Sequence, residues 1–435
     1  MKNKIVHTIL FIIIFSMLYQ DFPLVNIFGE LARTPIIFLI PFFIAYIFSQ
    51  KNIKFSPNTV YLFILISILF ITSTIYGCII FFKTGSIEIL GENIFFKALK
   101  MSMYPITALI FYIFIYSIIK NHKNIDLTIY SIFKKLQFFY FILLVVEGIY
   151  LKTQTAILPF LHSNPDKYYR IRLLTMEESW VGTVLILLSF FPIYLVQKLK
   201  KDKKERNRIY ALSALILIFY LFISESKGFL FVMIISVLPM AIYKLIASNK
   251  IKQFKKILLP ILSVSFFIAV ISFVSIVKSE LLTSVTFGTR FTSIISTLYI
   301  FITNPIGVGW TGYVYYYSNT INDIIHSGLM DQFNLLEIQD YINSSKNLSA
   351  KSYFLDGIIE GGLFFLIFFY LFFVRTYLQI KRNTENIWLK LISLYFILSG
   401  IVFITFHVKY EIWFIFAYIE ANNALSQSNK NIASV

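Results

Sequence analysis

Residues 59–82 read TVYLFILISILFITSTIYGCIIFF, an apolar run without a charged side chain. A run of about 20 such residues crosses the hydrocarbon core of a bilayer as a helix, because a helix satisfies its own backbone hydrogen bonds there. The rest of the chain is similar: hydrophobic residues make up 58% of the 435, charged residues 14%, and Phe occurs 48 times. This composition predicts a membrane protein.

Comparable runs recur along the chain and predict an all-α polytopic membrane protein with eleven or twelve transmembrane helices in a single integral membrane domain, residues 1–435. The first run follows Lys2 and Lys4 like a signal peptide, but no small-residue cleavage site comes after it, so we expect a retained helix. Besides residues 59–82, the predicted spans are Ile5–Tyr19, Pro35–Ser49, Met101–Ile119, Leu136–Leu151, Trp180–Gln197, Ile209–Ile223, Phe229–Ile246, Ile257–Val277, Phe354–Val374, Trp388–Phe406 and the short Ile412–Ile419.

The basic residues predict the orientation. If the amino terminus lies in the cytoplasm, most of the 39 Lys and Arg residues fall in inward-facing joints, above all Lys198–Arg208 and Lys244–Lys256. Because basic loops stay on the cytoplasmic side, we predict a multi-pass membrane protein with its amino terminus in the cytoplasm. The net charge of +17 then reflects topology and attraction to anionic lipid, and nucleic acid is not expected as a partner.

Two longer polar loops then face outward, a smaller one at residues 152–179 and a large one at residues 278–353. In the large loop, Arg290–Thr303 predicts a short amphipathic helix in the membrane interface, ending at Pro305. Asp323–Ile342 predicts a second helix. Because binding and catalytic residues gather in such loops, we expect the functional site there.

The sequence has no P-loop, no zinc-type spacing of His or Cys and no Gly-x-Ser-x-Gly turn. The inward joints are also too short for a domain that binds a nucleotide sugar. An enzyme on this scaffold is therefore expected to take an activated substrate that is already in the membrane, without a metal or another cofactor.

Several motifs, in this order along the chain, resemble those of the O-antigen polymerase and O-antigen ligase superfamily. The motifs are Ser224-Glu225-Ser226-Lys227-Gly228, Gly288-Thr289-Arg290-Phe291, Asn304-Pro305-Ile306-Gly307-Val308-Gly309-Trp310, and the segment from Ser352 to Glu360-Gly361-Gly362 that opens the next helix. In addition, Arg170 and Arg172 lie in the smaller outer loop, where the superfamily carries arginines.

The resemblance implies a metal-independent glycosyltransferase of the bacterial cytoplasmic (inner) membrane. It would polymerise undecaprenyl-pyrophosphate-linked oligosaccharide units into O-antigen or capsular or exopolysaccharide, on the outer side of that membrane. Its expected partners are membrane lipid, a chain-length regulator and a flippase. Guanidinium groups suit the pyrophosphate, and a carboxylate suits the role of base on the acceptor hydroxyl. Candidate catalytic residues are Arg290, Glu360, Glu177 and Glu178. Candidate substrate-binding residues are Arg170, Arg172, Lys227, Gly307, Gly309, Lys351 and Tyr313.

Alternatives stay open. Ligases of this superfamily carry a His nine residues before the Glu of the last motif, where this chain has Lys351. A protonated ammonium group cannot accept a proton, which favours a polymerase over a ligase. A lipid-linked oligosaccharide flippase would also have about twelve helices, with charged residues inside the bundle and short outer loops. Structural roles are open too: the glycines can shape a turn, and Tyr313 can belong to an interfacial aromatic belt.

Overall fold

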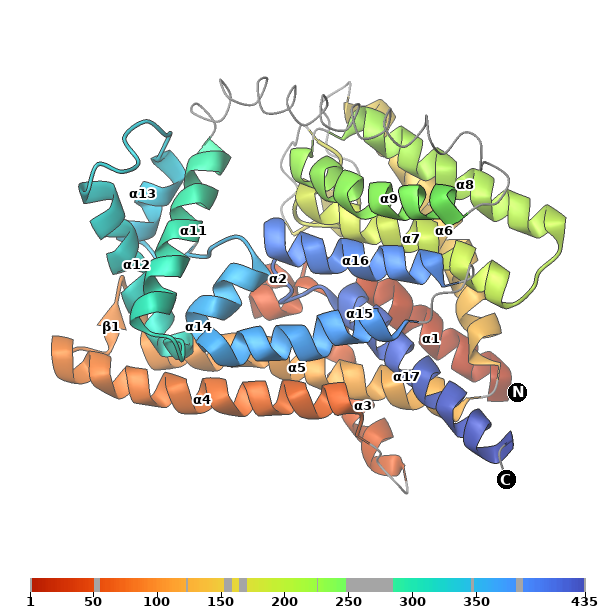
Figure 1. Ribbon diagram of the computed structural model, residues 1–435, viewed down its shortest axis with the longest axis horizontal. Coiled ribbons are helices and arrows are strands. Elements are labelled where there is room, and N and C mark those ends of the chain that lie inside the picture. The colour runs from red at the N-terminus through yellow and green to blue at the C-terminus, as the bar shows by residue number, and fades with distance from the viewer. Residues whose placement is uncertain are drawn as a thin grey trace. The chain divides into compact units, whose positions relative to one another are not determined.

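The computed structural model describes residues 2–50, 55–122, 124–151, 159–163, 170–224, 226–247, 285–345, 348–380 and 386–433. These residues are almost all helical, and the predicted all-α polytopic class is confirmed (Figure 1). The chain divides into two compact units. Unit 1 consists of Met1–Ile64, Met103–Val232 and Phe369–Val435, and unit 2 of Leu65–Ser102 and Met233–Phe368.

Seven helices in the described part of the chain are long and apolar enough to cross a membrane. They are α4 (Pro57–Thr84), α5 (Ile94–Asn121), α6 (Ile125–Leu151), α7 (Glu178–Lys198), α8 (Lys203–Ile223), α11 (Val285–Thr303) and Tyr353–Gln379, which joins α14 (Tyr353–Phe369), η4 (Tyr370–Val374) and α15 (Arg375–Gln379). Shorter apolar helical segments lie in α1 (Lys2–Leu18), α3 (Ile36–Ser49), α9 (Lys227–Ala247) and α16 (Ile387–Val402), at further predicted spans.

Unit 1 is built around α7. Every residue from Trp180 to Val196 is buried, as expected for a helix that is apolar on all its faces. Helices α6, α8, α16 and α17 (Tyr410–Ala433) pack around it. The ring of Phe191 lies 4.9 Å from that of Phe133 and 5.0 Å from that of Tyr418, so aromatic contacts join α7 to α6 and α17.

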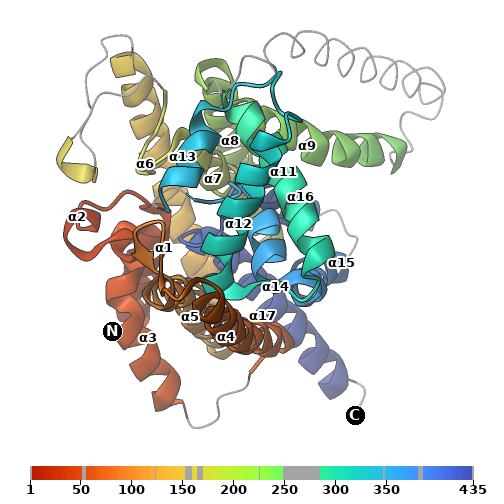
Figure 2. The same cartoon turned by 90° about the vertical axis from the view of Figure 1, so that its left-hand side faces the viewer.

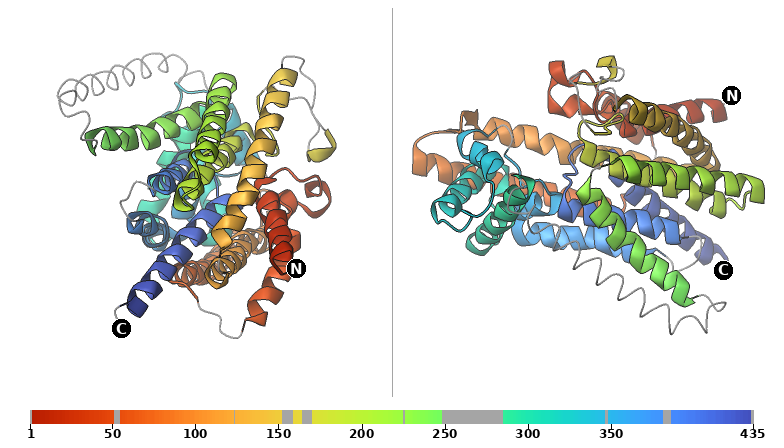
Figure 3. Two further views of the ribbon diagram at one scale, coloured as in Figure 1. Left: turned by 90° about the vertical axis from the view of Figure 1, so that its right-hand side faces the viewer. Right: turned by 90° about the horizontal axis from the view of Figure 1, so that it is seen from above.

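The loops of unit 1 carry short helices, and α6 packs against both α1 and α8 (Figure 3). The short helices are α2 (Val25–Phe28), η1 (Glu30–Arg33) and η2 (Pro159–Leu161). The loop after α1 and the segment before α7 meet in a parallel bridge between Gln20 and Thr175. The end of α1 and the start of α7 are thereby held together.

Unit 2 contains α11, α12 (Gly309–His326) and α13 (Leu336–Asn343), which pack against one another (Figures 1 and 2). It also holds a two-stranded antiparallel ribbon of β1 (Glu88–Ile89) and β2 (Glu92–Asn93). The buried face of α11 consists of small Gly, Ser and Thr residues, among them Gly288, Thr292 and Ser296, together with Ile300. Small side chains let helices approach closely, and the hydroxyl groups of Thr292 and Ser293 donate to carbonyl oxygens one turn earlier.

Some sequence predictions need correction. The predicted helix Asp323–Ile342 is wrong: α12 ends at His326, and Gly328 adopts φ +73° before α13 begins. The predicted Ile412–Ile419 segment is much too short, because α17 continues through polar residues to Ala433. Since a helix supplies its own backbone hydrogen bonds, it need not stop where apolar side chains stop.

The predicted interfacial helix Arg290–Thr303 begins earlier, at Val285, and as α11 it is also long and apolar enough to cross a membrane. Its place in the interface stays a prediction. The predicted span Ile257–Val277 lies outside the described residues, as do parts of both expected outer loops.

Candidate functional site

In unit 2, backbone hydrogen bonds join the turn at residues 304–309 to α14, which is interrupted at Gly362. Gly362 adopts φ +53° and ψ −131° inside that helix. The amide of Leu363 donates to the carbonyl of Pro305 at 2.8 Å, and the amide of Val308 donates to the carbonyl of Ile359 at 2.9 Å. The helical hydrogen bond expected between Leu363 and Ile359 is thus replaced by two bonds to the turn.

Glycine is required at this contact. Gly307 has φ +81°, and a Cβ atom there would lie 2.6 Å from the carbonyl carbon of Glu360. Gly309 has φ +65°, and a Cβ atom there would lie 2.5 Å from the amide nitrogen of Ser73 in α4. These two candidate residues therefore have a structural role in closing the turn against α14 and α4. Their contact with substrate stays a prediction.

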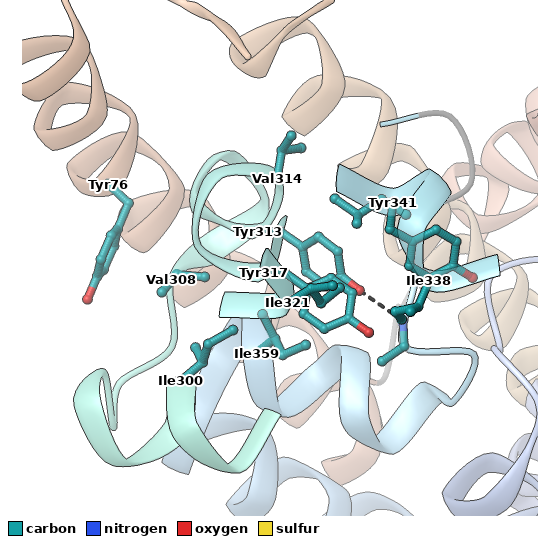
Figure 4. Packing of buried hydrophobic residues seen from close by; sticks show 12 residues of the cluster. Tyr76, Ile300, Val308, Tyr313, Val314, Tyr317, Ile321, Ile338, Tyr341 and Ile359 are labelled. Atoms are coloured by element: carbon teal, nitrogen blue, oxygen red, sulfur yellow. Dashed lines mark hydrogen bonds between the residues drawn. The ribbon is translucent and has the colours of Figure 1, made fainter. Parts of the chain in front are cut away.

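The buried carboxylate of Asp356 organises the segment that opens α14. It accepts hydrogen bonds from the hydroxyl of Tyr313 at 2.6 Å, the amide of Ala350 at 2.8 Å and the hydroxyl of Ser349 at 3.1 Å. Tyr313 and Tyr317 lie within the apolar core of unit 2 (Figure 4). Burial and the neighbouring Asp356 raise the pKa of Tyr313 well above its usual value. A ring buried in this way has no free face for a sugar.

Glu360 lies one turn after Asp356 on the same side of α14, about two turns from the start of the helix. Asp356 is 4% exposed and Glu360 8% exposed, and the side chain of Trp310 is hydrogen-bonded to Glu360. Two buried carboxyl groups in a membrane-spanning helix are costly, so such groups usually serve function. Glu360 was among the candidate residues predicted from the sequence and Asp356 was not, although an acidic residue in an apolar run was a usable signal.

Lys351 lies beside Glu337 of α13, and Arg290 follows Thr289, which contacts the same carboxylate. The ammonium of Lys351, a residue with φ +57°, lies 3.5 Å from a carboxylate oxygen of Glu337 in α13. That carboxylate also accepts a hydrogen bond from Thr289 at 2.9 Å, next to the half-buried Arg290 in α11. Lys351, Glu337 and the start of α11 therefore lie close together. Asp356 is linked to this group through its hydrogen bonds with Ser349 and Ala350, which directly precede Lys351.

In unit 1, Arg172 belongs to a buried cluster of charges around Asp21. An oxygen of Asp21 lies 2.7 Å from the ring nitrogen Nδ1 of His162 and 3.6 Å from a guanidinium nitrogen of Arg172. The other Asp21 oxygen lies 3.8 Å from a guanidinium nitrogen of Arg33, which also pairs with Glu30. Two guanidinium groups therefore converge on one carboxylate, an arrangement that favours anions.

The backbone beside Arg172 is fixed by a second buried carboxylate. Glu147 in α6 accepts hydrogen bonds from the amides of Arg172 and Leu173, both at 2.8 Å. Because a buried carboxylate must be compensated, these bonds explain Glu147 without a catalytic role.

The remaining candidates of unit 1 are more exposed. A guanidinium nitrogen of Arg170 lies 3.8 Å from a carboxylate oxygen of Glu178, the first residue of α7. Glu177 is exposed and precedes α7 directly, and Lys227 is exposed at the start of α9. The predicted turn before Lys227 is present, since α8 ends at Ile223, while Glu225 of that motif lies outside the described residues.

A further buried charged group lies in unit 1, and its residues were not among those predicted from the sequence. Lys409 and Glu411, both 0% exposed, lie 3.8 Å apart at the start of α17. The Lys409 ammonium donates to Gln20 at 2.6 Å and lies 4.2 Å from the centre of the Trp180 ring. Glu411 accepts from Gln20 at 2.7 Å and from Thr183 at 2.8 Å. Burial lowers the pKa of Lys409, although Glu411 opposes the shift. In the sequence, this group could have been recognised from the two charged residues on either side of Tyr410 within an apolar run.

The candidate residues thus form two groups. Unit 2 brings Gly307, Gly309, Tyr313, Lys351 and Glu360 around the start of α14, with Arg290 nearby on α11. Unit 1 holds Arg170, Arg172, Glu177, Glu178 and Lys227, with Arg172 in the Asp21 cluster. Among the described residues, no group of three or more His, Cys, Asp or Glu is arranged to hold a metal ion. Metal-free chemistry remains an expectation.

Comparison with known proteins gives one informative similarity. A protein of Klebsiella pneumoniae, described as an uncharacterized 49.5 kDa protein in cps region, is 31% identical over 163 residues. The aligned part covers 36% of this chain and 36% of that protein, so about a third of its length is matched. No family model matches the chain, and no solved structure matches it.

Proposed function

We propose that this protein polymerises lipid-linked oligosaccharide units into a surface polysaccharide. The similarity to a protein of a cps region, a capsule gene region, carries the proposal, because it points to polysaccharide formation. The membrane architecture supports it, since units carried on a polyprenyl lipid are joined at the membrane. A donor that is already activated as a pyrophosphate also needs no nucleotide-binding domain.

In the proposed reaction, a hydroxyl group of the acceptor unit attacks the anomeric carbon of the donor chain. A glycosidic C–O bond forms, and the bond between the anomeric carbon and the pyrophosphate oxygen breaks. The hydroxyl proton passes to a base, and the negative charge of the leaving pyrophosphate increases. Cations fixed in advance near that pyrophosphate stabilise the transition state more than the ground state.

Arg290 is the proposed partner of the pyrophosphate, because a planar guanidinium binds phosphate oxygens through two parallel hydrogen bonds. Arg172, in the Asp21 cluster, is the second candidate. Glu360 is the proposed base. Asp356 is less suitable, because Tyr313, Ser349 and Ala350 already donate to its oxygens. Each of these roles is open to substitution tests.

Deletion of the gene tests the function directly. We expect the cells to keep single repeat units on the final acceptor and to lose the long chains. Loss of a ligase would instead leave long polymer on the carrier lipid, and loss of a flippase would leave single units on the carrier at the inner side. Gel separation of surface polysaccharide and extraction of carrier-linked sugars distinguish these outcomes, and either of the latter two would refute a polymerase.

Complementation of the deletion strain tests the base. Glu360→Gln keeps the shape of the side chain and should abolish long chains while the protein level in the membrane stays near normal. Asp340→Asn, at an exposed carboxylate in α13, is the matched control and should restore polymer fully. Full polymer from Glu360→Gln would exclude the carboxylate as the base.

A further inference from the structure

A cavity of about 900 Å³ opens in unit 1, where α1 begins and α6 and α8 begin beside it. Its walls come from α1, the joint between α5 and α6, the first turns of α6, and the start of α8 with the joint before it. Helix α6 packs against both α1 and α8, so the walls belong to one packed group (Figure 3). None of the residues placed in the proposed polymerase site lines this cavity.

The lining is rich in cations and hydrogen-bond donors. Hydroxyl groups of Thr128 and Ser131 and the amide of Asn124 add neutral donors. The basic and acidic lining residues are Lys4, His7, His122, Lys134, Lys201 and Glu205.

The carboxylate of Glu205 is already engaged by the cavity wall. It accepts from the ammonium of Lys134 at 2.6 Å and from the hydroxyl of Tyr130 at 2.8 Å. The ammonium of Lys201 lies 5.8 Å from the centre of the Tyr130 ring, and this cation–π contact keeps the lysine at the cavity wall. Within the described residues, Lys4 and Lys201 have no carboxylate at ion-pair distance. The cavity therefore keeps a positive charge that its own walls do not neutralise.

We propose that this cavity binds the phosphate headgroup of an anionic membrane lipid. Lysine ammonium groups and hydroxyl donors match the charge and the acceptor oxygens of a phosphodiester. Exposed apolar side chains adjoin the polar lining, with Ile5 53% and Leu127 47% exposed, and acyl chains can lie along them. The predicted orientation places this end at the cytoplasmic leaflet, where anionic lipids attract basic groups near the surface.

A lipid bound here contacts α1, α6 and the joint before α8 together. Because a ligand that binds only the folded state stabilises it by mass action, anionic lipid should raise the melting temperature of the protein. This inference does not depend on the polymerase proposal, since it concerns other residues and a different ligand.

The experiment uses the purified full-length protein in neutral detergent, titrated with phosphatidylglycerol, phosphatidylcholine or inorganic phosphate. Native mass spectrometry counts bound lipids, and thermal unfolding reports stabilisation. The double variant Lys4→Gln with Lys201→Gln removes two cavity charges. The double variant Lys203→Gln with Lys204→Gln removes two exposed charges outside the cavity lining and is the matched control.

We expect one phosphatidylglycerol to be retained by the wild type and the control, and the cavity variant to bind it about tenfold more weakly or worse. Equal losses in both double variants would show a diffuse charge effect and overturn the proposal. Unchanged binding in the cavity variant, or retention of phosphatidylcholine equal to that of phosphatidylglycerol, would also overturn it. Inorganic phosphate that binds while phosphatidylglycerol does not would refute the lipid as the ligand.

Discussion

Replacing Gly362 with alanine should break the contact between the turn at residues 304–309 and the interrupted helix α14. Gly362 has φ +53°, and a Cβ atom would collide with the Pro305 carbonyl oxygen and lie 2.5 Å from the Gly307 nitrogen. The turn must therefore move away. The hydrogen bonds from Leu363 to Pro305 and from Val308 to Ile359 would be lost with it.

The cost follows from these parts. Backbone strain for a side chain in this conformation is about 1–3 kcal/mol. Two lost backbone hydrogen bonds add about 1 kcal/mol each. Gly362→Ala should therefore destabilise the protein by about 3–5 kcal/mol, which lowers the melting temperature by roughly 6–10 °C at roughly 2 °C per kcal/mol.

Gly91→Ala is the matched control. Gly91 also belongs to unit 2 and has φ +75°, but a Cβ atom there would meet nothing within 4 Å. This variant carries the backbone strain of about 1–3 kcal/mol without the collision, so it should lose about 2 kcal/mol less than Gly362→Ala. Heating the detergent-solubilised full-length protein and measuring the monodisperse fraction by size exclusion gives both melting temperatures. A Gly362→Ala variant that melts no lower than Gly91→Ala would refute the contact as a stabilising element.

Further predictions concern the charged groups and the topology. Arg290→Ala should abolish long polymer, measured on gels at equal membrane level, and Arg290→Lys should restore little of it; full activity of the alanine variant would refute a role on the pyrophosphate. Tyr313→Phe should cost about 1.5–3 kcal/mol, because it removes a hydrogen bond to the buried Asp356, and an unchanged melting temperature would contradict this. Burial lowers the pKa of Lys409, so the folded protein binds fewer protons between the lowered and the ordinary value. Stability should rise with pH over that interval, and Lys409→Met should flatten the rise in melting curves recorded across pH. A reporter fused after Lys204 should report cytoplasm, and an outer signal would invert the predicted orientation.

The sequence by itself determined the fold class and most helix positions. A bilayer has a nearly fixed thickness, so the length and apolarity of a run such as residues 59–82 are sufficient to identify a span. The ends of the apolar runs, together with the resemblance, also placed the turn before Lys227 and the helix start after Ser352. Apolar runs did not predict the length of α17, because this helix continues through polar residues.

Only the tertiary structure decided which charged side chains meet. Asp21, Arg33, His162 and Arg172 come from three stretches of sequence, and Gln20 joins Lys409 and Glu411 from opposite ends of the chain. It also showed that Tyr313 is buried against Asp356 and that the glycines at 307 and 309 close a turn. Hydrophobic periodicity records which residues avoid water, whereas a buried ion pair or hydrogen bond depends on the distance between side chains. That distance is set by how the helices pack, and no local pattern in the sequence contains it.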